Sequence, residues 1–135
     1  MTMNIESIEG IGPKYADMLK AAGIANTGQL LIAGSEPLGR KVLAERSGIN
    51  ETLILKWVNM SDLFRIKGVA GQYAELLEAA GVDTVKELRN RDAENLAQKM
   101  RAINQQKRVV RQVPSVKLVE GWITQAKLLE PAVKY

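Results

Sequence analysis

The chain has 135 residues, enough for one compact domain or two very small ones, and its formal net charge is +4. It contains neither cysteine nor histidine, which excludes disulfides, thiolate zinc sites, thiol nucleophiles and the commonest general base. The first ten residues, MTMNIESIEG, lack the basic start of a secretory signal. No apolar stretch approaches the roughly 20 residues of a membrane helix. We therefore expect a cytoplasmic protein that is not an enzyme and has no catalytic residue, metal or cofactor.

The chain reads as helical throughout, and its first helix is expected from Pro13, because a missing N–H costs nothing in the first turn. Glycines suited to end successive helices stand at Gly23, Gly34 and Gly48. Side chains that can cap the following helices recur along the chain. The candidate caps are Asn26 or Thr27, Ser35, Asn50, Asp83 or Thr84, Asp92 and Ser115. No stretch alternates with a period of two for long enough to form a sheet, so we predict an all-α fold.

One segment of the chain occurs twice. Residues 10–24 read GIGPKYADMLKAAGI, and residues 68–82, at an offset of 58, read GVAGQYAELLEAAGV. Fainter matches follow at the same offset, among them Leu38 with Leu96. Such self-similarity indicates an internal repeat of one helical unit.

The offset later grows to 65, where Trp57 meets Trp122. The second copy therefore contains seven extra residues, which form a basic insertion near residues 100–114. We predict two tandem units, residues 1–61 and 62–135, of about five short helices each. A unit of some sixty residues buries only a marginal core, so the two units are expected to pack together.

Positive charge gathers in the second half. Residues 1–62 carry a net charge of −1 and residues 63–135 a net charge of +5, and no acid occurs between residues 95 and 119. The basic residues of this acid-free stretch are Lys99, Arg101, Lys107, Arg108, Arg111 and Lys117. This asymmetry indicates a polyanionic partner, although a solvated basic face would have the same composition.

Each copy of the repeat opens with a glycine-rich turn between two expected helices. Glycine permits backbone angles that a side chain forbids and lets the backbone approach another molecule closely. Ile11 and Val69 should plug the core and fix each turn. The helices that begin at Pro13 and Gly71 then present free N–H groups and a positive dipole end, which suit an anion.

The segment IESIEGIGPKYADML, residues 5–19, resembles the helix-hairpin-helix motif of DNA repair and recombination proteins. The unit through SGINETLILKWV, residues 47–58, is similar to the double helix-hairpin-helix domain, a SAM-like fold, at the N-terminus of archaeal and eukaryotic RecA-superfamily recombinases. SGIN would be its second, degenerate hairpin. The whole chain resembles a group of small bacterial proteins that repeat this unit and are known only as a domain of unknown function.

The helix-hairpin-helix resemblance implies binding of DNA, or of RNA, through phosphates and without reading sequence. Carried over to this chain, the first hairpin would use Gly10, Ile11, Gly12 and Lys14. The second would use Gly68, Val69, Ala70 and Gly71, flanked by Arg65 and Lys67. The basic residues between Lys99 and Lys117 complete the predicted surface. Ala70 stands where the motif has glycine, so the second hairpin could be shifted toward Gly71.

Other interpretations stay open. Related helical units serve in protein–protein interaction, so the chain could be an adaptor that binds another protein, or itself, through an exposed apolar patch. In either interpretation we expect a monomer or a weak homo-oligomer. Tyr15 and Tyr73, just past each hairpin, could stack on a base, but packing between helices is favoured. Trp57 and Trp122 lie on apolar stripes and are expected in the core. No residues identify a metal site.

Overall fold

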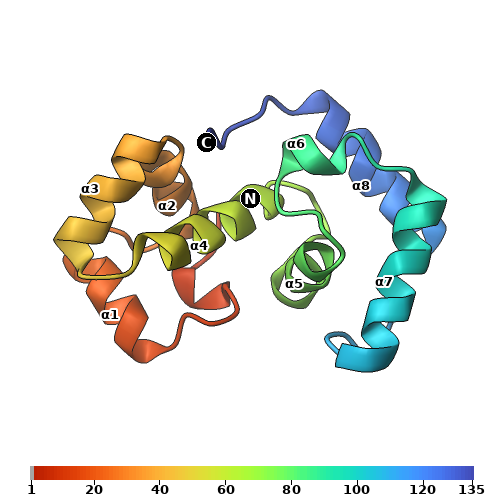
Figure 1. Cartoon of the computed structure of the whole chain (residues 1–135), viewed down its shortest axis with the longest axis horizontal. Coiled ribbons are helices and arrows are strands. Elements are labelled where there is room, and N and C mark those ends of the chain that lie inside the picture. Colours follow the sequence, from red (N-terminus) through yellow and green to blue (C-terminus); the bar gives the residue numbers. More distant parts are fainter. Residues whose placement is uncertain (1) are drawn as a thin grey trace.

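The computed structural model describes residues 2–135, and this part of the chain is all-helical, as predicted (Figure 1). It contains one 3-10 helix and eight α-helices and no strand. Their bounds are η1 Ile5–Ser7, α1 Pro13–Ala21, α2 Thr27–Gly34, α3 Pro37–Ser47, α4 Glu51–Leu63, α5 Gly71–Ala79, α6 Val85–Leu88, α7 Ala93–Lys107 and α8 Val116–Leu128. None of these helices is long and apolar enough to span a membrane.

Most helices of the chain begin at the expected caps. Asn26, Asn50, Thr84, Asp92 and Ser115 each accept a hydrogen bond from a backbone N–H in the first turn of the helix that follows. Local side-chain chemistry therefore sets these starts.

The predicted cap at Ser35 is wrong. Glu36 is the N-cap of α3, and Pro37 occupies its first turn. A residue before proline is pushed to the extended region, and Glu36 lies there with φ −119° and ψ 155°. The Ser35 hydroxyl instead donates to the Ile32 carbonyl oxygen.

The repeat is shifted in register between α3 and α7. The N-caps Glu36 and Asp92 are 56 residues apart, so the sequence match of Leu38 with Leu96 is wrong. Leu38 is 72% exposed whereas Leu96 is buried, so the two leucines do not occupy equivalent places in the packing. The α7 helix also has 15 residues against 11 in α3, which is one additional turn.

Helix α4 runs through the middle of the molecule, between the α1–α3 group and the α5–α8 group (Figure 1). The proposed division between residues 61 and 62 falls in its last turn, and residues 57–64 are all buried. There the Asp62 carboxylate accepts a bond from Arg65 Nη1 at 2.7 Å. Its second oxygen accepts the Val85 N–H at the start of α6, at 2.8 Å. The end of α4 thus organises the first turns of the second unit.

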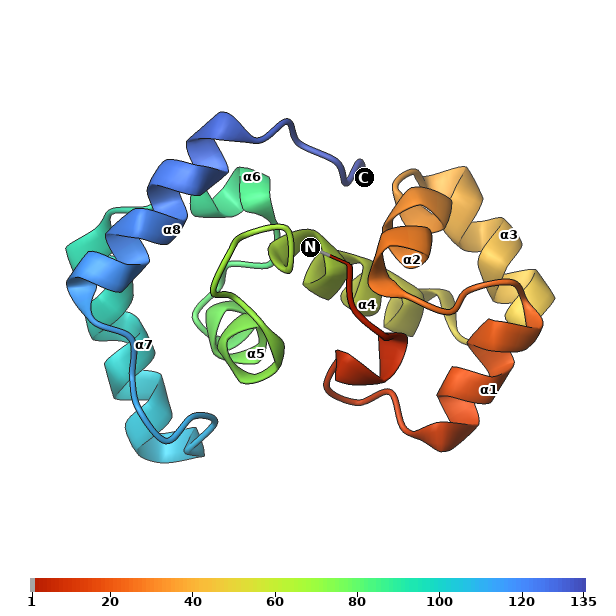
Figure 2. The same cartoon turned by 180° about the vertical axis from the view of Figure 1, so that it is seen from behind.

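The C-terminal residues return from α8 to the first unit (Figure 2). The Lys134 N–H donates to the Ser35 carbonyl oxygen at 2.7 Å. The buried Arg40 side chain donates to the carbonyl oxygens of Lys134 and Gly34, both at 2.8 Å. Val133 is buried beside these contacts. The tail therefore fastens the second unit to the end of α2.

The N-terminal residues are fastened to the opposite end of α2. The Met3 N–H donates to the Thr27 hydroxyl at 2.9 Å, and the Thr27 N–H donates to the Met3 carbonyl oxygen at 2.8 Å. Thr27 is the first residue of α2, and its side chain is buried. Both ends of the described chain are thus anchored on one short helix.

Candidate nucleic-acid interface

Two glycine turns at equivalent positions of the repeat open the two units. The first hairpin comprises residues 10–12 and the second residues 68–71. Gly10 and Gly68 have φ of +95° and +90°, in the region that favours glycine. Ile11 and Val69, which follow them, are buried as expected. The local sequence therefore fixes the shape of both turns.

The second hairpin leads into its helix in the same register as the first, but Gly71 has a positive φ of 26°, which the equivalent Pro13 cannot adopt. Helices α1 and α5 begin at Pro13 and Gly71, which are equivalent positions of the repeat. Ala70 takes the place of Gly12 as N-cap, and its φ of −139° is open to any residue. No side chain caps α1 or α5, so no side chain uses the N–H groups of their first turns.

The element before each hairpin is shorter than expected. Before the first hairpin the chain forms only η1, a single turn. Before the second, α4 ends at Leu63 and residues 64–67 form turns. The hairpins therefore join a short turn to a helix rather than two full helices.

The aromatic residues behind the hairpins belong to the core, as the packing interpretation predicted. Trp57 and Trp122 are each about 1% exposed. The Tyr15 ring lies 5.1 Å from that of Trp57, and the Tyr73 ring lies 5.4 Å from that of Trp122. Both tyrosines are half-buried and brace a hairpin against the last helix of its unit.

The two hairpin regions are neighbours in space. A side-chain carbon on Gly71 would lie 3.8 Å from the Ser7 carbonyl oxygen. The start of α5 therefore packs close to η1, which leads into the first hairpin.

On one side of the second hairpin, Lys67 and Lys117 line a common pocket. Gln125 holds this side in place, because its side chain accepts the Lys67 N–H at 2.9 Å and donates to the Lys67 carbonyl oxygen at 3.3 Å. Both lysine side chains are exposed. The α8 start thereby adds a second cation to the hairpin.

On the other side of the second hairpin lies the basic loop, residues 108–115, which leads from α7 to α8. Asn104 clamps this loop, because its side-chain amide both donates to and accepts from the backbone of Val110. The Tyr73 hydroxyl donates to the Gln112 carbonyl oxygen at 3.1 Å. Arg111 consequently lines one pocket with Gly71 and Tyr73.

Several residues of the predicted surface lie elsewhere or are engaged. Arg65 bonds to Asp62 and to the Glu130 carbonyl oxygen, so it anchors the tail instead of facing outward. Lys99 lies beside Gly81, at the opposite end of α5 from the hairpin. Arg101 is exposed midway along α7, and Lys107 and Arg108 are exposed where α7 meets the basic loop. Lys14 is exposed in the first turn of α1, with Glu9 exposed before the first hairpin.

Two acidic side chains with raised pKa values, Glu78 and Asp83, lie between the units and away from the basic loop. Glu78 and Asp83 line one pocket with Lys56, whose ammonium is 3.9 Å from the Glu78 carboxylate. Burial raises the pKa of both carboxyl groups above the ordinary values. Among residues 2–135, no group of three or more acidic side chains is arranged to hold a metal ion.

Gln125, Asn104 and Tyr73 position the cations of this surface, and sequence reasoning assigned none of them that role. Lys67 and Gln125 are 58 residues apart, and no local pattern connects them. For Tyr73, the signal was its place two residues after the predicted hairpin.

The profile of a protein family described as a domain of unknown function (DUF4332) matches residues 9–129 of the chain. The match covers both units, and the chain belongs to this family. No curated protein and no solved structure matches the chain significantly.

Proposed function

We propose that this member of the DUF4332 family binds nucleic acid through the phosphate backbone, without reading base sequence. The two glycine turns would act as helix-hairpin-helix elements, with the second hairpin as the principal contact. DNA is the expected ligand, and RNA is the alternative ligand of the same chemistry. Backbone N–H groups at the start of α5 would approach phosphate oxygens, and nearby cations would supply the electrostatic attraction.

The observation that carries this proposal is the folding of the basic loop against the second hairpin. The Tyr73–Gln112 bond and the Asn104 clamp hold Arg111 beside Gly71. No acidic residue lines either of the two pockets beside this hairpin. Arg111 thus lies beside the uncapped start of α5. Lys67, which directly precedes Gly68, and Lys117 line the second pocket, toward α8.

The first hairpin would contribute less. It has a single nearby cation, Lys14, and the exposed carboxylates of Glu9 and Asp17 are close in sequence. Like charges near a phosphate reduce the attraction that a lysine provides. The duplication then raises affinity because two weak contacts act on one polymer.

The test is fluorescence anisotropy of a labelled generic duplex and of a single strand, each titrated at two salt concentrations. About four phosphate contacts would make the logarithm of affinity fall with the logarithm of salt concentration with a slope of roughly −3 to −4. Arg108→Glu with Arg111→Glu should weaken binding at least tenfold. The strand with higher affinity would identify the preferred form of nucleic acid.

The matched control reverses two exposed lysines outside this surface, Lys41→Glu with Lys86→Glu, and changes net charge by the same amount. It should retain most of the affinity. If micromolar protein binds neither nucleic acid at low salt, the proposal is wrong. Equal losses in both double variants would show that only overall charge matters, and would remove the assignment to the second hairpin.

A further inference from the structure

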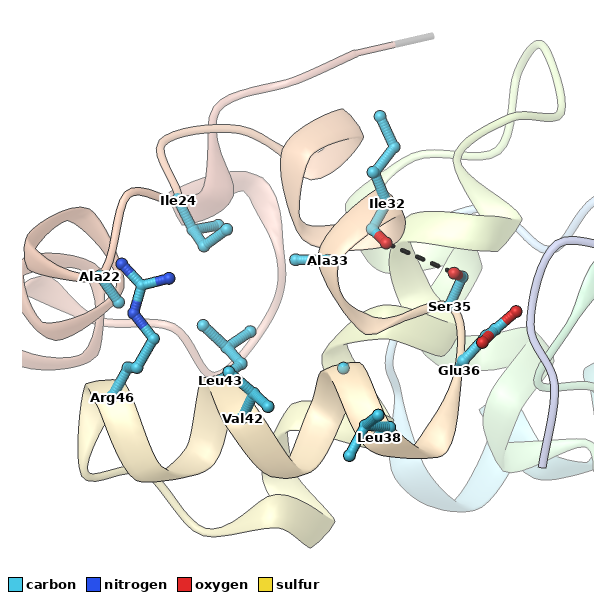
Figure 3. A pocket seen from close by; sticks show the side chains of 11 residues that line it. Ala22, Ile24, Ile32, Ala33, Ser35, Glu36, Leu38, Val42, Leu43 and Arg46 are labelled. Carbon is cyan, nitrogen blue, oxygen red and sulfur yellow. Dashed lines mark hydrogen bonds between the residues drawn. The ribbon is translucent and has the colours of Figure 1, made fainter.

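An open groove of about 400 Å³ lies between α2 and α3, on the far side of these helices from α4 (Figure 3). Ala22, Ile24 and Leu43 form its buried floor. Leu38 and Val42, on α3, are 72% and 43% exposed along it. Ile32, on α2, is 81% exposed. We call this feature the α2–α3 groove.

The walls of the α2–α3 groove are rigidly placed. A Cβ on Gly39 would overlap the Ala33 carbonyl oxygen, and a Cβ on Gly34 would overlap a methyl group of Val58. The two helices therefore cross at contact distance, and α2 packs equally closely on α4. A preformed groove loses little conformational entropy when a ligand binds.

The second unit shows that the fold does not require apolar residues on this face. Equivalent positions can be counted from the N-caps, Asn26 with Thr84 and Glu36 with Asp92. The resulting pairs are Ile32 with Asn90, which lies in the turn just past the short α6, Leu38 with Glu94, and Val42 with Gln98. All six side chains are exposed, but those of the first unit are apolar and those of the second are polar. The apolar character thus belongs to the first unit alone, as a binding face would.

Charge differs between the two ends of the α2–α3 groove (Figure 3). At one end Glu36 is paired with Lys134, at 3.6 Å. At the other end Arg46 lies beside Ala22 and Ile24, and within the described residues it makes no ion pair. The groove therefore offers apolar contact and one unneutralised positive charge at its end.

We propose that the α2–α3 groove binds an amphipathic helix of another protein, with an acidic residue at the end that meets Arg46. The 11 residues of α3 extend over about 16 Å, which matches three turns of a ligand helix. Apolar side chains at positions i, i+4 and i+7 of the ligand would contact Ile32, Leu38 and Val42.

A second copy of the chain fits this face less well than a helix. The groove is lined by 11 residues, whereas a stable protein–protein interface uses about 20–30 residues on each side. A helix lying in a groove reaches its floor as well as its rim, and so buries more apolar surface per residue than two facing patches do. This site is independent of the proposed nucleic-acid surface.

The test uses the full chain and a phage-displayed library of 15-residue helical peptides, randomised on one face and at both ends. The variant Ile32→Asn, Leu38→Glu, Val42→Gln places the residues of the second unit on the first. Selected peptides should carry an i, i+4, i+7 apolar row and a terminal acid. Their affinity, measured by fluorescence anisotropy, should fall at least tenfold in this triple variant and about threefold or more in Arg46→Glu.

Two control variants and two further measurements make the outcome decisive. Lys41→Glu should leave peptide affinity unchanged, and so should Arg108→Glu with Arg111→Glu, which addresses the nucleic-acid surface alone. Circular dichroism should show native helicity in the triple variant. If the triple variant does not fold, the single variant Leu38→Glu takes its place in the binding measurements. Sedimentation of the parent and of the variant measures self-association.

The proposal is overturned if no peptide is enriched, or if enriched peptides bind the triple variant as tightly as the parent. Basic peptides, or affinity indifferent to Arg46→Glu, would overturn the assigned chemistry of the partner. A parent that dimerises in solution, beside a triple variant that does not, would show that a second copy occupies the groove instead.

Discussion

Gly68 lies directly over the indole nitrogen of Trp122. A Cβ on this glycine would be 3.2 Å from Trp122 Nε1, and this nitrogen is buried with no hydrogen-bond partner in the described residues. The first unit repeats the arrangement with Gly10 and Trp57, at a looser 3.8 Å. Each unit therefore closes its first turn onto its last helix through a glycine and a tryptophan.

The change Gly68→Ala should destabilise the protein by about 2 kcal/mol, because alanine is strained at a left-handed φ and the new methyl group meets Trp122. Gly10→Ala should lower the free energy of unfolding by about 1 kcal/mol, since the new methyl group makes only ordinary contact with Trp57 and the backbone strain alone destabilises the protein. Urea unfolding followed by tryptophan fluorescence measures both.

Gly12→Ala is the matched control for these changes, because its φ is −85° and a Cβ there meets nothing within 4 Å. Its effect should stay within about 0.5 kcal/mol. Equal losses at Gly12 and Gly68 would contradict the account of the turn.

The change Arg40→Met should lower the free energy of unfolding by about 2–3 kcal/mol. It removes a buried charged donor, so the carbonyl oxygens of Gly34 and Lys134 lose their hydrogen bonds to this side chain. The exposed Arg46, changed to Met on the same helix, should shift stability by no more than about 0.5 kcal/mol. In a chain that ends at residue 129, Arg40→Met should cost less than in the full chain. If Arg40→Met lowers stability by the same amount in the shortened chain as in the full chain, the effects of the substitution and the truncation are additive, and Arg40 does not hold the tail.

Arg108 is the one residue other than glycine with positive φ in residues 2–135 (φ 50°, ψ 48°). Arg108→Gly should therefore stabilise the protein by about 1 kcal/mol relative to Arg108→Ala, since both variants lose the same charge and only glycine relieves the backbone. Both should weaken nucleic-acid binding equally. A thermal melt that ranks alanine above glycine would refute the backbone argument.

The stability contributed by Asp83 should depend on pH. Burial raises the pKa of its carboxyl group in the folded state, and the carboxylate of Glu87 adds to this, whereas Arg91 opposes it. The folded state then holds the proton more tightly than the unfolded chain does, so stability falls as pH rises from the ordinary aspartate pKa through the raised one. Asp83→Asn should be slightly more stable than the parent at pH 7.

That gain should shrink as pH is lowered through the same window, because the parent carboxyl group becomes protonated. Thermal melts of both proteins from pH 3 to pH 7 provide the measurement. A gain that is constant over this range would indicate a packing effect and not a titration.

Local chemistry made much of the fold predictable. Asn50 and Ser115 are suited to capping wherever a helix follows, and the glycine pattern requires the turn at Gly68. The prediction failed at Ser35 because the neighbouring Pro37 imposes its own start. It also failed at Leu38, where the register depends on that start.

The candidate site was only partly predictable, because charge in a sequence does not reveal its partner. The sequence suggested Arg65 as a phosphate ligand, but its guanidinium donates hydrogen bonds to Asp62 and to the Glu130 carbonyl oxygen in the C-terminal tail. Arg111 reaches the second hairpin only because Tyr73 and Asn104 fold the basic loop back. Such contacts join distant segments, and no periodicity or motif encodes them.

The anchoring of both chain ends on α2 bears on how the protein can be cut and rejoined. Met3 bonds at Thr27 and Lys134 at Ser35, so the two attachment points are separated by one eight-residue helix, about 12 Å long. A short flexible linker could join the ends, and new ends could be opened between α7 and α8. Such a circular permutant would keep both units closed, while any protein fused at either end of residues 2–135 would emerge beside α2.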